Sequence, residues 1–116
     1  VAFAHTGEGL LGTVSSDKSC RLWRLDSGAC SGVLEAHTDE VNFLSFHTAQ
    51  AQLATASDDK TAILWDLETA RPFRTLMGHQ SEVYTVCWQD KEGPLLASAS
   101  FDLTAKLWDP RSNAST

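Results

Sequence analysis

The sequence is short of the features that mark membrane, secreted and nucleic-acid-binding proteins. No apolar run in its 116 residues approaches the roughly 20 that a membrane-spanning helix needs, and the first residues, VAFAHTGEG, have neither the basic flank nor the apolar core of a signal peptide. Basic residues number 9 against 15 acidic ones, and the formal charge of −6 opposes binding to phosphate backbones. We therefore expect an intracellular chain, cytoplasmic or nuclear, with no membrane partner and no direct nucleic-acid partner.

Cysteine is scarce and shows no pattern. The three cysteines, Cys20, Cys30 and Cys87, are odd in number and lack CxxC spacing, so the sequence predicts neither a disulfide framework nor a zinc site. This usage fits a reducing compartment. No metal and no cofactor are expected, and His5 and His47 fall in predicted loops, where contact with water is expected.

The sequence does contain an internal repeat, with about three copies of one unit. Trp23, Trp65 and Trp108 are spaced by 42 and 43 residues, and the motif S-x-D-x-[ST]-x-x-x-W ends at each of them. A fixed period of this length indicates a repeat architecture. We place the units at 1–36, which lacks the start of its inner strand, at 37–78, which is complete, and at 79–116, which lacks its outer strand.

Within the complete unit the local pattern is that of β-strands. Four short runs, at 41–46, 53–57, 61–66 and 71–77, are rich in β-branched and aromatic residues and are separated by turn residues, with no stripe of helical period. Pro72 lies in the fourth run, which predicts an edge strand because proline lacks a backbone N–H. The third run is apolar on both faces, with Ala62 and Leu64 on one and Ile63 and Trp65 on the other. Neighbouring units must therefore cover both faces.

These features resemble those of a known family. The period, the Gly78-His79 and Ala36-His37 pairs, and the Trp-Asp pairs at 65–66 and 108–109 resemble the WD-repeat propellers over essentially the whole chain. The resemblance implies an all-β propeller of about three four-stranded blades, the first and last incomplete, as part of a seven-bladed ring. Alone, such blades would expose sheet edges and apolar faces, so we expect the remaining blades of a longer chain, or copies of this one, to cover them.

The recurring His, Ser and Asp raise the alternative of a hydrolase triad at His79, Ser98 and Asp102. A catalytic site is needed once, whereas this spacing recurs, and a buried indole N–H needs a hydroxyl acceptor. We therefore expect no enzyme, and the resemblance implies structural tetrads instead. Their members are His37, Thr55, Asp59 and Trp65; His79, Ser98, Asp102 and Trp108; and, incompletely, Thr13, Asp17 and Trp23. Either Thr55 or Ser57 completes the tetrad of the 37–78 unit. A strand pairing that places Thr55 beside Trp65 favours Thr55.

Function is expected on the loops rather than on the strands. By resemblance, the residue before each turn Asp and the residues that begin each inner strand share one face: Ser16, Asp58, Phe101, Glu40, Asn42, Glu82 and Tyr84. A turn tip has no folding reason to carry Phe101, and Tyr84 with an acidic rim is expected beside it. This arrangement predicts a dock for a basic or amphipathic peptide of a protein partner. The alternative is that Phe101 packs on an adjacent loop.

The predicted function is a non-catalytic protein–protein interaction scaffold, with two special cases. The box Trp108-Asp109-Pro110-Arg111 resembles that of substrate receptors of cullin-type ubiquitin ligases, in which the Arg contributes to adaptor binding. The segments HTDEVN, SDDKT and LLASASFD resemble those of the transducin-β-like corepressor propellers, which are nuclear scaffolds. Either role would use the chain to hold other proteins.

Overall fold

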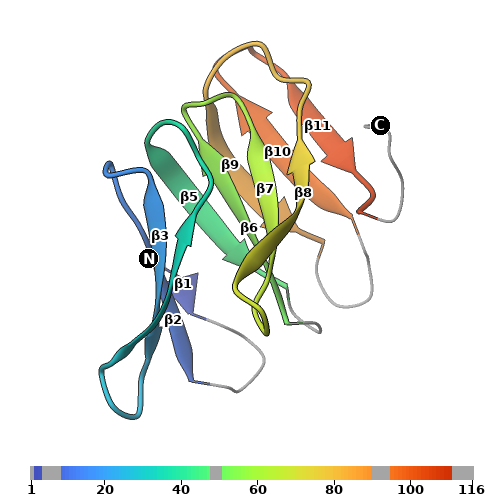
Figure 1. The fold of residues 1–116 in the computed structure, drawn as a ribbon. Coiled ribbons are helices and arrows are strands. Elements are labelled where there is room, and N and C mark those ends of the chain that lie inside the picture. The colour runs from blue at the N-terminus through green and yellow to red at the C-terminus, as the bar shows by residue number, and fades with distance from the viewer. Residues whose placement is uncertain (1, 4–8, 48–50, 90–94, 111–116) are drawn as a thin grey trace.

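The computed structural model describes residues 2–3, 9–47, 51–89 and 95–110. Within these residues the chain forms eleven strands, arranged in three antiparallel sheets that stand side by side (Figure 1). None of the described residues belongs to a helix long and apolar enough to cross a membrane. The all-β fold predicted from the short alternating runs is confirmed.

Each sheet is built from strands that follow one another along the chain. Sheet 1 contains β1 (Ala2–Phe3), β2 (Leu10–Val14), β3 (Ser19–Arg24) and β4 (Cys30–Glu35). Sheet 2 contains β5 (Val41–Phe46), β6 (Gln52–Ser57), β7 (Ala62–Asp66) and β8 (Arg71–Leu76). Sheet 3 contains β9 (Val83–Trp88), β10 (Leu96–Ser100) and β11 (Ala105–Trp108). Each strand after the first pairs antiparallel with the strand that precedes it in its sheet.

Sheet 2 is buried on both faces, as the apolar pattern of its third strand predicts. Leu64 packs with Val83 and Val86 of sheet 3 in one core cluster. On the opposite face, Trp65 packs with Leu22 of sheet 1 in a second cluster. The two cores are separate, because the side chains of a strand alternate between the faces of its sheet.

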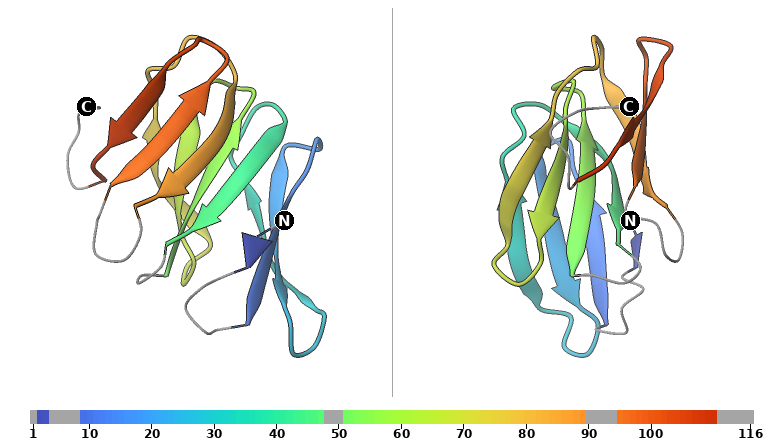
Figure 2. Two further views of the ribbon diagram at one scale, coloured as in Figure 1. Left: turned by 180° about the vertical axis from the view of Figure 1, so that it is seen from behind. Right: turned by 90° about the vertical axis from the view of Figure 1, so that its right-hand side faces the viewer.

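The sheets meet along their first strands and spread apart toward their outer strands (Figure 2). Pro72 lies on β8, the outer edge of sheet 2, as its missing N–H predicts. Hydrogen bonds from side chains join sheet 2 to sheet 3: the Asn42 amide donates to the Val83 carbonyl oxygen at 2.9 Å, the Arg74 guanidinium to the Pro110 carbonyl oxygen at 2.6 Å, and the Trp88 indole to the Ser45 carbonyl oxygen at 3.0 Å. Adjacent sheets are thus joined by polar contacts as well as by their apolar cores.

Gly12 lies where sheet 1 closely approaches sheet 2. A Cβ added there would lie 3.0 Å from a methyl of Leu44 and 3.1 Å from the ring of Phe46. We expect Gly12→Ala to lower the free energy of unfolding by about 1 to 3 kcal/mol, because the two sheets would have to separate to admit the methyl group. Urea unfolding followed by tryptophan fluorescence measures this change.

Gly32→Ala is the matched control for Gly12→Ala. Gly32 lies in the same sheet, and its added Cβ would meet Leu22 and Ala70 at 3.8 and 3.9 Å, which are ordinary contact distances. This variant should keep the wild-type stability. Equal losses in both variants would show that the spacing between the sheets does not depend on Gly12.

Candidate functional site

The site with the most polar contacts is the turn between the second and third strands of each sheet. In sheet 2, Ser57 N donates to Thr61 O at 3.2 Å and Lys60 N donates to Ser57 O at 3.3 Å, which closes a hairpin of three loop residues. Lys60 adopts a left-handed backbone with φ 74°. Such loops place a left-handed residue last, and Lys18 and Leu103 occupy this position in the other two turns with φ of 77° and 70°.

The Ser that opens the motif fastens the turn to the chain before the first strand. Ser57 Oγ donates to Glu40 O at 2.7 Å and accepts from Asp59 N at 3.1 Å. In sheet 3, Ser100 Oγ donates to Ser81 O at 3.1 Å and accepts from Asp102 N at 3.0 Å. The hydroxyl of Ser57 is therefore engaged within its own turn and is not the acceptor for Trp65.

Thr55 accepts that indole proton. Trp65 Nε1 donates to Thr55 Oγ1 at 2.9 Å, and the same oxygen lies 2.7 Å from His37 Nε2. His37 Nδ1 in turn lies 2.8 Å from Asp59 Oδ2. Thr55 does not lie directly opposite Trp65, because the strand partner of Trp65 is Leu53, so the hydroxyl reaches the indole diagonally.

Sheet 3 repeats this network with a serine in place of the threonine. Trp108 Nε1 donates to Ser98 Oγ at 2.8 Å, His79 Nε2 lies 2.7 Å from Ser98 Oγ, and His79 Nδ1 lies 3.0 Å from Asp102 Oδ2. In sheet 1, Trp23 donates to Thr13 at 3.1 Å, and Asp17 accepts from the backbone N–H of Ser19. The structure thus brings together all the residues expected in the two complete tetrads.

The hydrogen bonds in sheet 2 fit one directed chain. Trp65 donates to Thr55, and a neutral His37 with its proton on Nδ1 would accept from Thr55 and donate to Asp59. Burial lowers the pKa of His37, and the Asp59 carboxylate opposes that effect only in part. Burial would raise the pKa of Asp59, but hydrogen bonds from Thr61 and His37 outweigh it and hold the pKa below its usual value. A neutral imidazole beside a carboxylate satisfies every polar group in the chain.

The His79, Ser98 and Asp102 geometry has the contacts of a catalytic triad but not the access that catalysis needs. Ser98 is 2% exposed and its oxygen already accepts from the Trp108 indole, so no substrate carbonyl can approach it. The hydrogen bond from Thr104 is the main reason that the pKa of Asp102 lies well below its usual range. The arrangement supports a structural fastening rather than nucleophilic chemistry.

Two pairs of side chains occupy equivalent places at the turn end of sheets 2 and 3. Asn42 Nδ2 donates to Asp58 Oδ1 at 2.7 Å in sheet 2. In sheet 3 the corresponding residues are Tyr84 and Phe101, whose ring centroids lie 5.1 Å apart and which are 44% and 62% exposed. A hydrogen-bonded polar pair is thus replaced by an exposed aromatic pair.

The remaining residues predicted for this face lie at the same end of the sheets. Glu40 and Glu82 accept through their backbone oxygens from Asp58 N at 2.9 Å and Phe101 N at 3.0 Å, which ties each strand start to its turn. Ser16 is exposed in the corresponding turn of sheet 1. The hydrogen bond from Ser81 lowers the pKa of Glu82, which therefore carries its charge at neutral pH.

Leu103 belongs to the same surface and was missed by the sequence analysis. It lines a hollow of about 420 Å³ together with Tyr84, Phe101, Ala99 and Ala105. The available signal was a leucine in a motif position where the other two turns carry Lys18 and Lys60.

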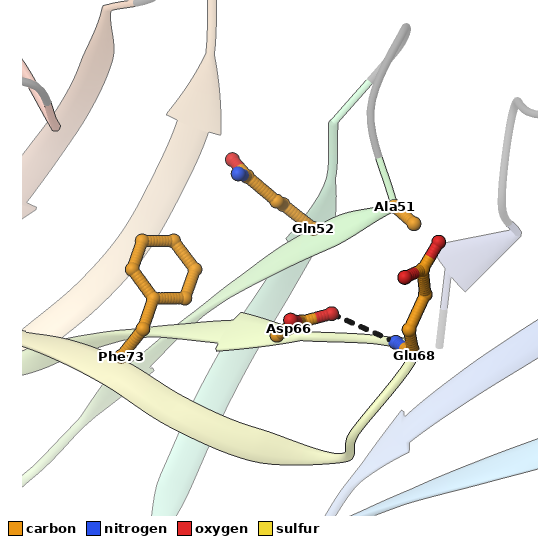
Figure 3. A pocket seen from close by; sticks show the side chains of 5 residues that line it. All are labelled: Ala51, Gln52, Asp66, Glu68 and Phe73. Atoms are coloured by element: carbon orange, nitrogen blue, oxygen red, sulfur yellow. Dashed lines mark hydrogen bonds between the residues drawn. The ribbon is translucent and has the colours of Figure 1, made fainter.

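A pocket of about 280 Å³ lies at the opposite end of sheet 2, lined by Ala51, Gln52, Asp66, Glu68 and Phe73 (Figure 3). The Asp66 carboxylate accepts from the backbone N–H of Glu68 at 2.9 Å and so caps the β7–β8 turn. Among the described residues, no group of three or more His, Cys, Asp or Glu side chains is placed to hold a metal ion. The lining of the pocket includes two carboxylates, Asp66 and Glu68, and so falls short of such a group.

The expectation that His47 contacts water is wrong. His47 is 6% exposed and its ring packs edge-on against Trp88 of sheet 3, at a centroid distance of 4.8 Å. This burial lowers the pKa of His47. His47 does lie outside the strands, just after β5, but the expected water contact is wrong because the covering ring comes from another unit, about 40 residues along the chain. His5 and Arg111 lie outside the described residues.

The model of the family described as "WD domain, G-beta repeat" matches residues 28–66 and 70–109, more than half of the chain. The chain belongs to the WD-repeat family. Each matched WD repeat begins in the outer strand of one sheet and ends with the third strand of the next, so that each repeat links two neighbouring sheets. WD repeats generally serve as non-catalytic scaffolds for protein–protein interaction. A search of the curated proteins found no match.

Thr55→Val tests the network directly. The substitution removes the hydroxyl shared by Trp65 and His37 and leaves two buried polar groups without a partner, so the free energy of unfolding should fall by about 2 kcal/mol or more. Thr55→Ser keeps a hydroxyl at this position, as Ser98 does in sheet 3. We expect this variant to lose about 1 kcal/mol of the free energy of unfolding because of the missing methyl group. Equal losses in urea unfolding would mean that the hydroxyl contributes nothing.

The pKa shifts predict that stability declines with acidification in two steps. The pKa of folded His37 lies below 6.5, so the unfolded chain binds the proton first and the free energy of unfolding falls as pH drops below about 6.5. The lowered pKa of Asp59 adds a further loss near and below pH 3.8. Urea midpoints measured from about pH 7.5 to 5 test the first step. A His37→Gln chain should show a flatter profile, and an unchanged slope would exclude His37 as the titrating group.

Proposed function

We propose that this WD-repeat chain is a scaffold that holds a segment of a protein partner at the turn end of its sheets, with Tyr84 and Phe101 as anchors. The observation that carries the proposal is the substitution of an exposed aromatic pair in sheet 3 for the Asn42–Asp58 pair of sheet 2. The hairpin folds with polar residues in these positions, so the aromatic rings are not needed for the turn. Exposed aromatic side chains of this kind supply much of the energy of protein interfaces.

The charges around the pair select a basic or amphipathic segment. Glu40 and Glu82 begin the adjacent inner strands, and Asp58 lies in the neighbouring turn. Lys60 is the cation near these carboxylates, and it contributes to the lowered pKa of Glu82. The three carboxylates outnumber this one cation. The chain as a whole carries a formal charge of −6. Carboxylates at the rim speed the encounter with a positively charged partner and orient it, while the apolar centre contributes affinity.

The two more specific roles rest on sequence words alone. Arg111, the residue that would contact a ligase adaptor, lies outside the described residues. No geometry of the described residues favours a ubiquitin-ligase receptor or a corepressor subunit over another scaffold. The proposal therefore concerns the surface and the chemistry of the segment that binds there.

A fluorescein-labelled synthetic peptide of alternating leucine and lysine blocks provides a probe for this surface. We expect Tyr84→Ala combined with Phe101→Ala to weaken its binding about tenfold or more in fluorescence anisotropy, because two aromatic anchors are removed. Phe73→Ala is the matched control, since Phe73 is 46% exposed at the other end of sheet 2. Equal weakening in the control would place the binding elsewhere.

A further inference from the structure

Leu103 is held in an unfavourable backbone conformation and buries almost nothing. It is 95% exposed, and its φ of 70° lies in the left-handed region that disfavours residues with a branched or bulky side chain. A leucine in this position contributes no apolar burial to the fold. The left-handed backbone is the one that these three-residue turns require, so the unusual feature is the leucine and not the φ.

The other two sheets show what this position needs for folding. Lys18 and Lys60 hold it with almost the same φ, 77° and 74°, and both are exposed. Lys60 is exposed although sheet 3 packs against the face of sheet 2 beside it. The exposure of Leu103 therefore belongs to the turn itself and is not caused by the uncovered face of sheet 3.

Leu103 and Phe101 stand on either side of Asp102, and Asp102 fixes the turn from below. Its carboxylate accepts from the backbone N–H of Gln80 and from Thr104 N, each at 2.9 Å, and from His79 at 3.0 Å. The two apolar side chains are thus presented from a rigid backbone, which reduces the ordering that binding would require. The hollow of about 420 Å³ lies beside them.

We propose that Leu103 is a third anchor of the partner surface, so that the bound segment is amphipathic rather than only basic. An aliphatic or aromatic side chain of the partner sits between Phe101 and Leu103, at the turn end of the hollow that both residues line with Tyr84. Lysine or arginine side chains of the same segment face Glu82. This inference rests on the proposed function and adds the class of segment that the surface takes.

Two labelled peptides of equal length and charge test the inference on the full chain. One combines leucine with lysine, and the other has serine in place of every leucine. The wild-type chain should bind the leucine peptide about tenfold more tightly than the serine peptide. Leu103→Lys, which restores the residue of the other two turns, and Leu103→Gly, which suits the left-handed backbone, should both reduce this preference at least threefold, on the order expected for one lost anchor.

The stability of the variants separates a binding role from a folding role. Leu103→Gly should leave the urea midpoint unchanged or raise it, because glycine adopts a positive φ without strain. A lowered midpoint would make Leu103 a folding residue and overturn the inference. Val33→Lys, which removes another exposed aliphatic group, should leave both affinities unchanged.

The peptide results also separate this inference from the proposed function. Equal affinity for the two peptides, with no effect of Leu103→Lys, would overturn the third anchor while the acidic rim still bound a basic segment. Failure of both peptides to bind would count against the proposed function and the inference together. A preference for the leucine peptide that persists in both Leu103 variants would place the apolar contact on other residues.

Discussion

Sheet 2 is apolar on both faces, and this constraint organises the rest of the structure. Leu64 and Trp65 are adjacent in sequence but point to opposite faces, each into a core shared with a different neighbouring sheet. A sheet of this kind cannot be stable alone, since both of its apolar faces would be exposed to water. Stacking side by side also aligns the hairpin turns of all three sheets at one end, which creates the surface where binding is proposed.

The polar networks at the turn end of the sheets have a structural role. His37, Thr55, Asp59 and Trp65 satisfy one another inside the sheet, and the Asp fixes its turn from within. The residues immediately before and after each Asp take no part in the network, so they are free to differ. They are Ser16 and Lys18, then Asp58 and Lys60, then Phe101 and Leu103. The repeated network fixes each turn, so the residues beside the Asp can differ from one turn to the next. These variable positions carry the proposed binding chemistry.

Some features could be predicted because they depend on neighbours in sequence. The strand runs, the edge position of Pro72 and the two-faced pattern of the third strand follow from backbone chemistry and alternation, and the structure bears them out. Other features depend on residues about 40 positions away. His47 was expected in water but packs against Trp88, and Asn42 reaches the Val83 carbonyl, because the adjoining sheet supplies the partner in each case. No local pattern around His47 or Asn42 reports which ring or carbonyl will lie beside it.

The amino-acid sequence by itself determined the repeat, the strand type and the residues able to form each network, since these follow from period, alternation and hydrogen-bonding capacity. Only the tertiary structure decided which hydroxyl is used. The Thr55 hydroxyl accepts from the Trp65 indole, whereas the Ser57 hydroxyl, two residues later, donates to the carbonyl oxygen of Glu40. It also decided that Leu103 faces solvent while Asp102 turns inward. Both outcomes depend on the register of the paired strands and on the conformation of the turn, because these decide which groups lie beside each side chain.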